Sequence, residues 1–323
     1  MHAAAIILRG GVFPRNTRLR GQSIIEYVLI IAVIGLVIVF AGPGVAGAIR
    51  NQFNLVGNTV NNGTTGGIEG GAAGGGSAGA DSATVQAAIA KDAKDWTLGE
   101  QKAVAEDIAA KGEASPAYAK AKAAMDAGTK FSMKLTDGKT LEYRIIGINH
   151  DDLADGSGKA GLTFEATNDA MGEQRMNATD TNVGGWEKSE LRGRFNTGDL
   201  WALLPAEVQS KAKTVTKMTD NQGGGKAGTP SATTDKVFLL STTEIYGDYQ
   251  SDGTQYEYYK SKGVTMSNYS GASSSGHHWT RSVYSGAMYP GNSAFFQKVD
   301  SNGRYYNGNN ATHTYYVCPA WCF

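Results

Sequence analysis

The sequence predicts an α+β protein with a long apolar N-terminal helix, a flexible linker, short helices and a mixed C-terminal domain. Three observations support this: residues 27–48 carry no charge, residues 61–80 are rich in glycine and asparagine, and strand-like patterns begin after Lys130. The predicted parts are a leader (1–21), an N-terminal helix (22–58), a linker (59–81), a helical spacer (82–128) and a head domain (129–323).

The composition excludes some classes of protein. The chain has 323 residues, with 30 basic and 30 acidic side chains, so it lacks the positive charge of a nucleic-acid-binding protein. The leader carries four arginines and no acid, and its removal leaves 26 basic and 30 acidic residues. Only two cysteines occur, so a disulfide framework does not hold the fold together.

The apolar run in residues 22–58 is long enough for a membrane helix. About 20 residues at 1.5 Å each cover the roughly 30 Å of a bilayer core. The arginine-rich leader predicts a single pass across the cytoplasmic membrane with the C-terminus outside. A plain signal anchor is one alternative, and a secretory signal cleaved within AGPGVAGA is another.

The segment RGQSIIEY, from Arg20 to Tyr27, resembles type IVb pilins of the Flp/Tad kind. The resemblance implies cleavage by prepilin peptidase between Gly21 and Gln22, with Glu26 and Tyr27 as assembly residues. It also implies that Glu26 pairs with the new N-terminal amine of a neighbouring pilin subunit. The implied partners are other subunits, the pilus assembly machinery and the inner membrane before assembly, and the final location is an extracellular pilus.

The spacer contains short helical patterns with recognisable ends. Thr97 and Glu100 have capping-box spacing, Ser115 precedes a proline at a helix start, and Gly128 ends that helix. The apolar stripes are thin, which favours a collar on another surface over a coiled-coil partner.

The head domain reads as strands, turns and a few helices. Asp137 and Gly138 predict a hairpin, residues 184–213 predict two helices, and Ser241 with Glu244 predicts a capped helix after a buried strand. Asn302 and Gly303 predict a turn between two late strands.

Six segments of the head, including MNATDTNVGGWEKSELRGRFN, TTDKVFLLSTTEIYG and the closing VCPAWCF, resemble an uncharacterised domain family of gut-bacterial surface proteins. That family is similar to the formylglycine-generating-enzyme branch of the C-type lectin fold. The resemblance implies a lectin-like head domain but no activity, because a fold does not determine function.

Several kinds of chemistry find no support in the sequence. Neither glycine-lysine pair has the spacing of a phosphate loop, and an EF-hand frame starting at Asp151 places leucines at ligand positions. The triplets with which C-type lectins hold calcium and sugar are absent. His277, His278 and His313 lack a further ligand at metal spacing, so no metal and no cofactor are expected.

Cys318 and Cys322 close the chain. Their spacing favours two buried small side chains. A local disulfide is the alternative if Pro319 bends the strand, and a catalytic pair is not favoured.

Tyrosine is concentrated late in the chain: 12 of the 15 lie from Tyr246 onward, interleaved with serine, asparagine and glycine. Binding surfaces of antibodies use the same residue types. Tyr246, Tyr256 and Tyr316 are expected in the core. The residues predicted to bind a ligand are Trp279, Arg281, Tyr284, Tyr289, Asn292, Phe296, Tyr305, Tyr306, Asn309, His313 and Tyr315.

The sequence therefore predicts a type IV pilin, or a minor or tip subunit, that displays an adhesive head for an unknown protein or glycan ligand. Related lectin-like proteins diversify such surfaces by mutation of adenines, and the residue types here are similar. The alternatives are an anchored or secreted enzyme of formylglycine-generating-like fold and a purely structural pilin with an inert head.

Overall fold

The computed structural model describes residues 82–323 except 248–250 and 285–291, and these residues form a mixed α/β domain. The predicted leader, N-terminal helix and linker, with Gly21, Gln22, Glu26 and Tyr27, lie outside the described residues.

The fold class and the single-pass localisation need a correction. No helix among the described residues is long and apolar enough to cross a membrane. The longest of these helices, α4 (Leu98–Lys111), has 14 residues, which span about 21 Å, and it carries charges along its length.

Helices α3 (Ala83–Ile89), α4 and α5 (Tyr118–Ala127) come first, with two short 3-10 turns at Ala93–Asp95 and Gly112–Ala114. The predicted capping box starts α4: Thr97 Oγ1 accepts from the Glu100 amide, and Glu100 accepts from the Thr97 amide at 2.7 Å. Gly128 ends α5 in the left-handed region, as predicted, but α5 begins three residues after Ser115.

Five strands make the first sheet, in the order β1-β2-β3-β12-β7. Their bounds are β1 Phe131–Lys134, β2 Thr140–Ile148, β3 Leu162–Ala166, β7 Val237–Phe238 and β12 Ala320–Cys322. The predicted hairpin joins β1 to β2, with Gly138 at φ 86°. The last strand of the chain, β12, lies between β3 and β7, so the C-terminus is buried in the core.

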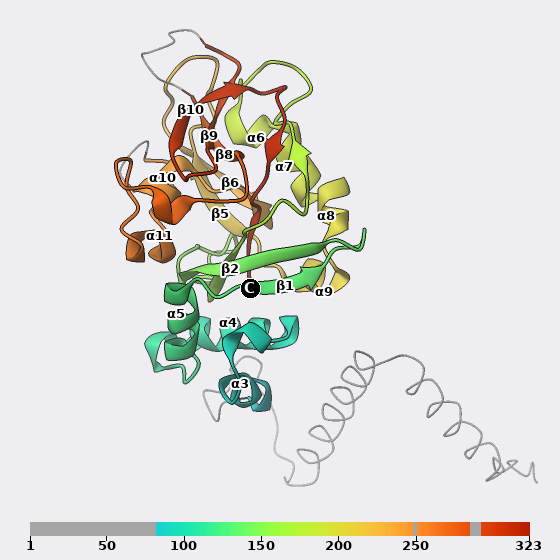
Figure 1. Ribbon diagram of the computed structural model, residues 1–323, viewed down its shortest axis with the longest axis vertical. Helices are drawn as coiled ribbons and strands as arrows, with labels where there is room; N and C mark the ends of the chain where they lie inside the picture. Colours follow the sequence, from blue (N-terminus) through green and yellow to red (C-terminus); the bar gives the residue numbers. More distant parts are fainter. Residues whose placement is uncertain (1–81, 248–250, 285–291) are drawn as a thin grey trace, which may run out of the picture. The chain divides into compact units, whose positions relative to one another are not determined.

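The second sheet has the order β10-β9-β8-β11-β4. Its strands are β4 Glu173–Gln174, β8 His278–Val283, β9 Phe295–Val299, β10 Tyr305–Asn310 and β11 Tyr315–Tyr316. The predicted turn at Asn302 and Gly303 connects β9 to β10. In Figure 1 this sheet and helices α3–α5 lie on opposite sides of β1 and β2.

The segments between the sheets differ in part from the prediction. Residues 184–213 form four short helices instead of two: α6 Gly185–Lys188, α7 Glu190–Asn196, α8 Asp199–Leu203 and α9 Ala206–Lys211. A two-stranded sheet follows, made of β5 Val215–Thr219 and β6 Ser231–Asp235. The buried strand predicted before Ser241 is only two residues long. Helices α10 (Thr242–Tyr246) and α11 (Glu257–Ser261) and a 3-10 turn at Ser270–Ala272 complete the fold.

The helices predicted as a spacer share the hydrophobic core of the first sheet. Val104 and Ile108 of α4 are fully buried with the aromatic residues Phe131, Tyr143 and Phe164. Gly161, just before β3, allows the close approach, because an added Cβ would lie 1.8 Å from the carbonyl oxygen of Ala105.

Candidate functional site

A cluster of buried charges brings together residues from both large sheets, the two-stranded sheet and α10. Asp151 follows β2, Lys217 comes from β5, Glu244 from α10 and Arg281 from β8. Each is at most 3% exposed. Glu244 is held in place by its own helix cap, since its carboxylate accepts from the Ser241 amide at 3.0 Å. Sequence reasoning assigned Arg281 to a ligand surface and did not identify Lys217.

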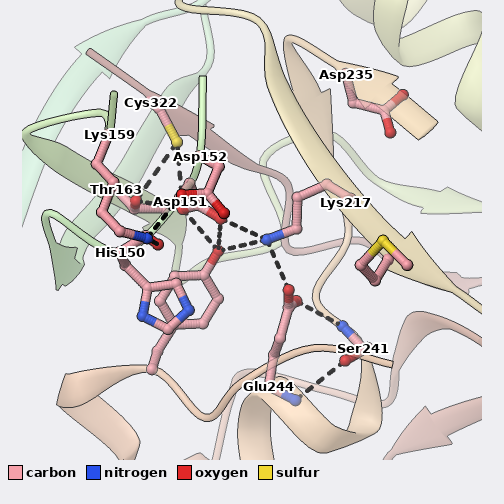
Figure 2. Close-up of polar contacts among 12 residues, drawn as sticks. His150, Asp151, Asp152, Lys159, Thr163, Lys217, Asp235, Ser241, Glu244 and Cys322 are labelled. Carbon is pink, nitrogen blue, oxygen red and sulfur yellow. Dashed lines mark hydrogen bonds and ion pairs between the residues drawn. The ribbon is translucent and has the colours of Figure 1, made fainter. Parts of the chain in front are cut away.

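Opposite charges alternate through this cluster. The Lys217 ammonium lies 2.5 Å from Asp151 and 2.6 Å from Glu244, as Figure 2 shows. Glu244 also binds the Arg281 guanidinium through both of its oxygens. Arg281 donates further to the carbonyl oxygens of Leu239, Met218 and Asp252 and to Thr219. Every charge therefore has a partner.

The direction of each pKa shift in the cluster favours the charged form of the side chain. Burial disfavours ionisation of Asp151 and Glu244, but the neighbouring cations outweigh it and hold the pKa of both carboxyls below their usual values. Burial also opposes the charge on Lys217, yet the two carboxylates raise its pKa. Two cations and two anions cancel, so the cluster is a structural ionic lock with no free acid or base.

A polar cleft of about 320 Å³ is lined in part by Asp151, Lys217 and Glu244 of this cluster. His150 forms one wall: its ring stacks on Tyr256 at 4.0 Å, and its Nδ1 lies 3.1 Å from Glu257. Asp152 pairs with Lys159 at 2.8 Å, so the charged groups of the wall are largely satisfied by one another. The cleft shows no nucleophile beside a free base.

Both cysteines are free and buried, so the structure has no disulfide between Cys318 and Cys322. Cys322 Sγ contacts Asp151 and Thr163 at 3.4 Å. Burial raises the pKa of both thiols well above the usual value, which keeps them protonated and poorly nucleophilic.

Ser274 and His278 form the one serine-histidine contact among the described hydrogen bonds, 2.9 Å from Oγ to Nδ1. The Ser274 hydroxyl also lies 2.8 Å from the Gly276 carbonyl, so a second acceptor competes with Nδ1 for its one proton. Burial lowers the pKa of His278 to about 4, and the adjoining cavity of about 10 Å³ holds no more than a water. This pair lacks the access that catalysis on a substrate requires.

The aspartates considered as metal ligands in the sequence do not come together around one site. Asp151 belongs to the ionic lock, while Asp155 accepts from the backbone and hydroxyl of Ser157 and closes its own loop. Within residues 82–323, apart from the two undescribed loops, no group of three histidine, cysteine or acidic side chains is arranged to hold a metal.

The residues predicted to bind a ligand divide into three sets. Four belong to the core and are not available at the surface: Trp279, Arg281, Tyr284 and Phe296. Six are partly or fully exposed: Asn292, Tyr305, Tyr306, Asn309, His313 and Tyr315. Tyr289 lies outside the described residues. Of the tyrosines expected in the core, Tyr246 and Tyr256 are buried and Tyr316 is partly exposed.

Four side chains form a row across the second sheet. The strand register places Tyr306 beside Lys298, and Lys298 beside Trp279. Tyr315 follows, with its ring edge-to-face on Trp279 at 4.8 Å. Tyr306 is 50% exposed, while Trp279 is buried and donates its indole N–H to the Gln174 carbonyl.

Lys298 occupies the middle of this row. Its Nζ lies 4.0 Å from the centre of the Tyr315 ring and 5.0 Å from that of Tyr306. The residue is only 6% exposed, because its aliphatic stem is covered. Its Nζ atom is not fully buried, so the tip of the ammonium group reaches solvent. It has no hydrogen bond or ion pair with another described residue.

We call the surface formed by Lys298, Tyr306, Asn309 and Tyr315 the Lys298 face. Asn309 fixes one of its rings, since its amide donates to the Tyr315 hydroxyl at 2.6 Å. Sequence reasoning identified Tyr306, Asn309 and Tyr315 but missed Lys298. The predicted turn at Asn302 and Gly303 could have indicated Lys298, because a hairpin closed at this turn pairs residue 298 with residue 306.

The comparisons with known proteins give one family. Residues 157–323, more than half of the chain, match a domain family described as domain of unknown function DUF6273. No curated protein and no solved structure matches the chain.

Proposed function

The chain belongs to the DUF6273 domain family, and from this premise we propose that its head is a non-catalytic binding domain whose ligand contacts the Lys298 face. The head is carried by a subunit of the type IV pilin kind. The pilin part of the proposal rests on the resemblance of residues 20–27, which lie outside the described residues.

One observation carries the binding role: a lysine without an acidic partner is held between two tyrosine rings at the surface of a sheet. A surface lysine ordinarily extends into water and keeps its rotamer freedom. Here the stem is buried and the ammonium is fixed in place, so little conformational entropy is lost when an anion or acceptor binds it.

The rest of the described chain favours binding over catalysis. The thiols are buried, the serine-histidine pair is enclosed, and the strongest charges neutralise one another in the ionic lock. These features support a rigid scaffold beneath a polar and aromatic surface.

A binding screen with the full-length chain tests the proposal. Wild type is applied to an array of glycans and to a panel of matrix proteins, together with Tyr306→Ala and the control Met266→Ala. Met266 is another exposed apolar side chain, 37% exposed, outside the Lys298 face. We expect Tyr306→Ala to reduce binding to each positive probe about tenfold, because an aromatic contact is lost, and Met266→Ala to leave it unchanged.

An inert head predicts a different result. If wild type binds no probe, or if both variants bind as wild type does, the Lys298 face is not a ligand site and the head has a structural role.

A further inference from the structure

We infer that the ligand of the Lys298 face is an acidic carbohydrate, a glycan whose sugar carries a carboxylate that binds Lys298. This inference rests on the proposed binding function and adds the chemical class of the ligand. It follows from the charge, the aromatic rings and the strand geometry of the face.

The charge of the surface calls for an anion. Beyond Ser270 the chain has three basic residues and one acid, Asp300. Of the three, Arg281 is neutralised in the core by Glu244. Asp300 accepts from the backbone amides of Asn302 and Arg304 at 2.9 Å, so it stabilises its own turn. Asp180 and Glu173 lie at the ends of β10 and β11, where they accept from Thr312 and Thr314, and no described carboxylate forms an ion pair with Lys298.

The rings on either side of Lys298 suit a sugar. Tyr306 is half exposed and Tyr315 is partly exposed, and each combines an apolar ring with a hydroxyl at its edge. A pyranose has the matching pattern, with an apolar C–H face and hydroxyls around its rim. A carboxylate on that ring is the group that Lys298 can bind as a point charge.

The same strands disfavour an acidic peptide. Peptides often bind by adding a strand to an open sheet edge, and β10 is the edge strand of this sheet. The β9–β10 register is broken between Tyr306 and Asn309, and Gly308 has φ 123°. Such a bulge twists the edge and interrupts the row of amides and carbonyls that a peptide strand needs. The face, and not the edge, is therefore the site of contact.

The test compares three polymers and three variants of the full-length chain. The polymers are polygalacturonate, the same polymer after reduction of its carboxyl groups, and polyglutamate as an acidic peptide. The variants are Lys298→Met, which keeps the stem and removes the charge, Tyr306→Ala, and the control Lys236→Met. Lys236 is an exposed lysine that lies over the Trp201 ring on another surface.

We expect wild type to bind polygalacturonate at least about tenfold more tightly than the other two polymers. Lys298→Met should lose about tenfold in affinity and most of the salt dependence, while Lys236→Met should bind as wild type does. Thermal unfolding of each variant shows whether a loss of binding comes from a loss of fold.

The outcomes separate this inference from the proposed function. Equal binding of the carboxyl-reduced polymer, with Tyr306→Ala defective and Lys298→Met normal, overturns the acidic class but leaves a binding face. Equal or tighter binding of polyglutamate that depends on Lys298 overturns the carbohydrate class. If polygalacturonate does not bind although other probes do, the inference is wrong; if no probe depends on Tyr306 or Lys298, the proposed function fails as well.

Discussion

At the scale of single residues, burial decides what a titratable side chain can do. His278 is 5% exposed, and its environment lowers its pKa from 6.5 to about 4. Burial is the main cause, and the neighbouring Arg144 and His277 act in the same direction, whereas the Gly276 carbonyl and Asp300 oppose them. The folded protein therefore keeps this imidazole neutral where an unfolded chain protonates it.

This difference predicts a pH-dependent stability. Because the pKa in the folded state is lower, the contribution of His278 is complete above pH 6.5 and is lost as pH falls toward 4. We expect the free energy of unfolding to fall by about 2 kcal/mol between pH 7 and pH 5, measured by urea denaturation. Asp151 and Glu244 add a further loss at lower pH, because their pKa values are depressed from 3.8 and 4.5.

The variant His278→Gln should show a much flatter profile between pH 7 and pH 5, although it is less stable overall. His313→Gln serves as the matched control, since His313 is exposed. A profile for His278→Gln as steep as that of wild type would contradict the assignment.

At the scale of elements, the contact between α4 and the start of β3 joins the N-terminal helices to the first sheet. The side-chain amide of Asn149 donates to the Ile108 carbonyl at 3.3 Å, and the side-chain oxygen of Gln101 accepts from the Tyr143 hydroxyl at 3.1 Å. Gly161 leaves no room for a side chain against Ala105. The thin apolar stripe of α4 is therefore sufficient to hold this helix on the sheet, because the backbone of α4 touches the backbone just before β3.

The substitution Gly161→Ala tests this contact. Its Cβ would collide with the Ala105 carbonyl, so α4 must move, and we expect a loss of about 3 kcal/mol in the free energy of unfolding. Gly193→Ala in α7 is the matched control, because nothing lies within 4 Å of its Cβ and alanine favours a helix. Similar stabilities for the two variants would show that α4 does not pack this closely.

At the scale of the whole molecule, the described residues form a single compact unit in which both sheets and helices α3–α5 contribute to one hydrophobic core. The Lys298 face belongs to the sheet that lies opposite those helices (Figure 1). If a pilin-like N-terminus assembles the subunits, each subunit presents one such face, and weak single contacts are multiplied by avidity.

The N-terminal part of the proposal has its own prediction. We expect N-terminal sequencing of the mature protein from sheared filaments to begin at Gln22. Glu26→Ala should be processed normally but be absent from filaments, because the pilin proposal pairs this carboxylate with the amine of a neighbouring subunit. Glu69→Ala, which removes a carboxylate from the predicted linker, should assemble as wild type does. A mature protein that begins after Ala46 or Ala48 would contradict the pilin role.

Local features of the spacer and the head followed from the sequence by itself. The capping boxes at Thr97 and Ser241, the turns at Gly138 and Gly303, and the helix end at Gly128 all agree with the structure. Each depends on residues within three or four positions of one another, so spacing alone carries the information.

The candidate site could be predicted only in part. The same turn at Asn302 and Gly303 places Lys298 beside Tyr306, but the second ring, Tyr315, comes from β11, which lies two strands away from β9 in the sheet. Composition pointed to Tyr305, Tyr306 and Tyr315, which are exposed or partly exposed, but also to Trp279, Tyr284 and Phe296, which are buried.

Tertiary structure alone decided the ionic lock and the state of the thiols. Lys217 meets Asp151 across 66 positions of sequence, and Arg281 meets Glu244 across 37. Cys322 is inaccessible because β12 lies between β3 and β7. Such pairings depend on the order of strands in a sheet, which is determined by the burial of apolar surface over the whole domain and not by neighbours along the chain.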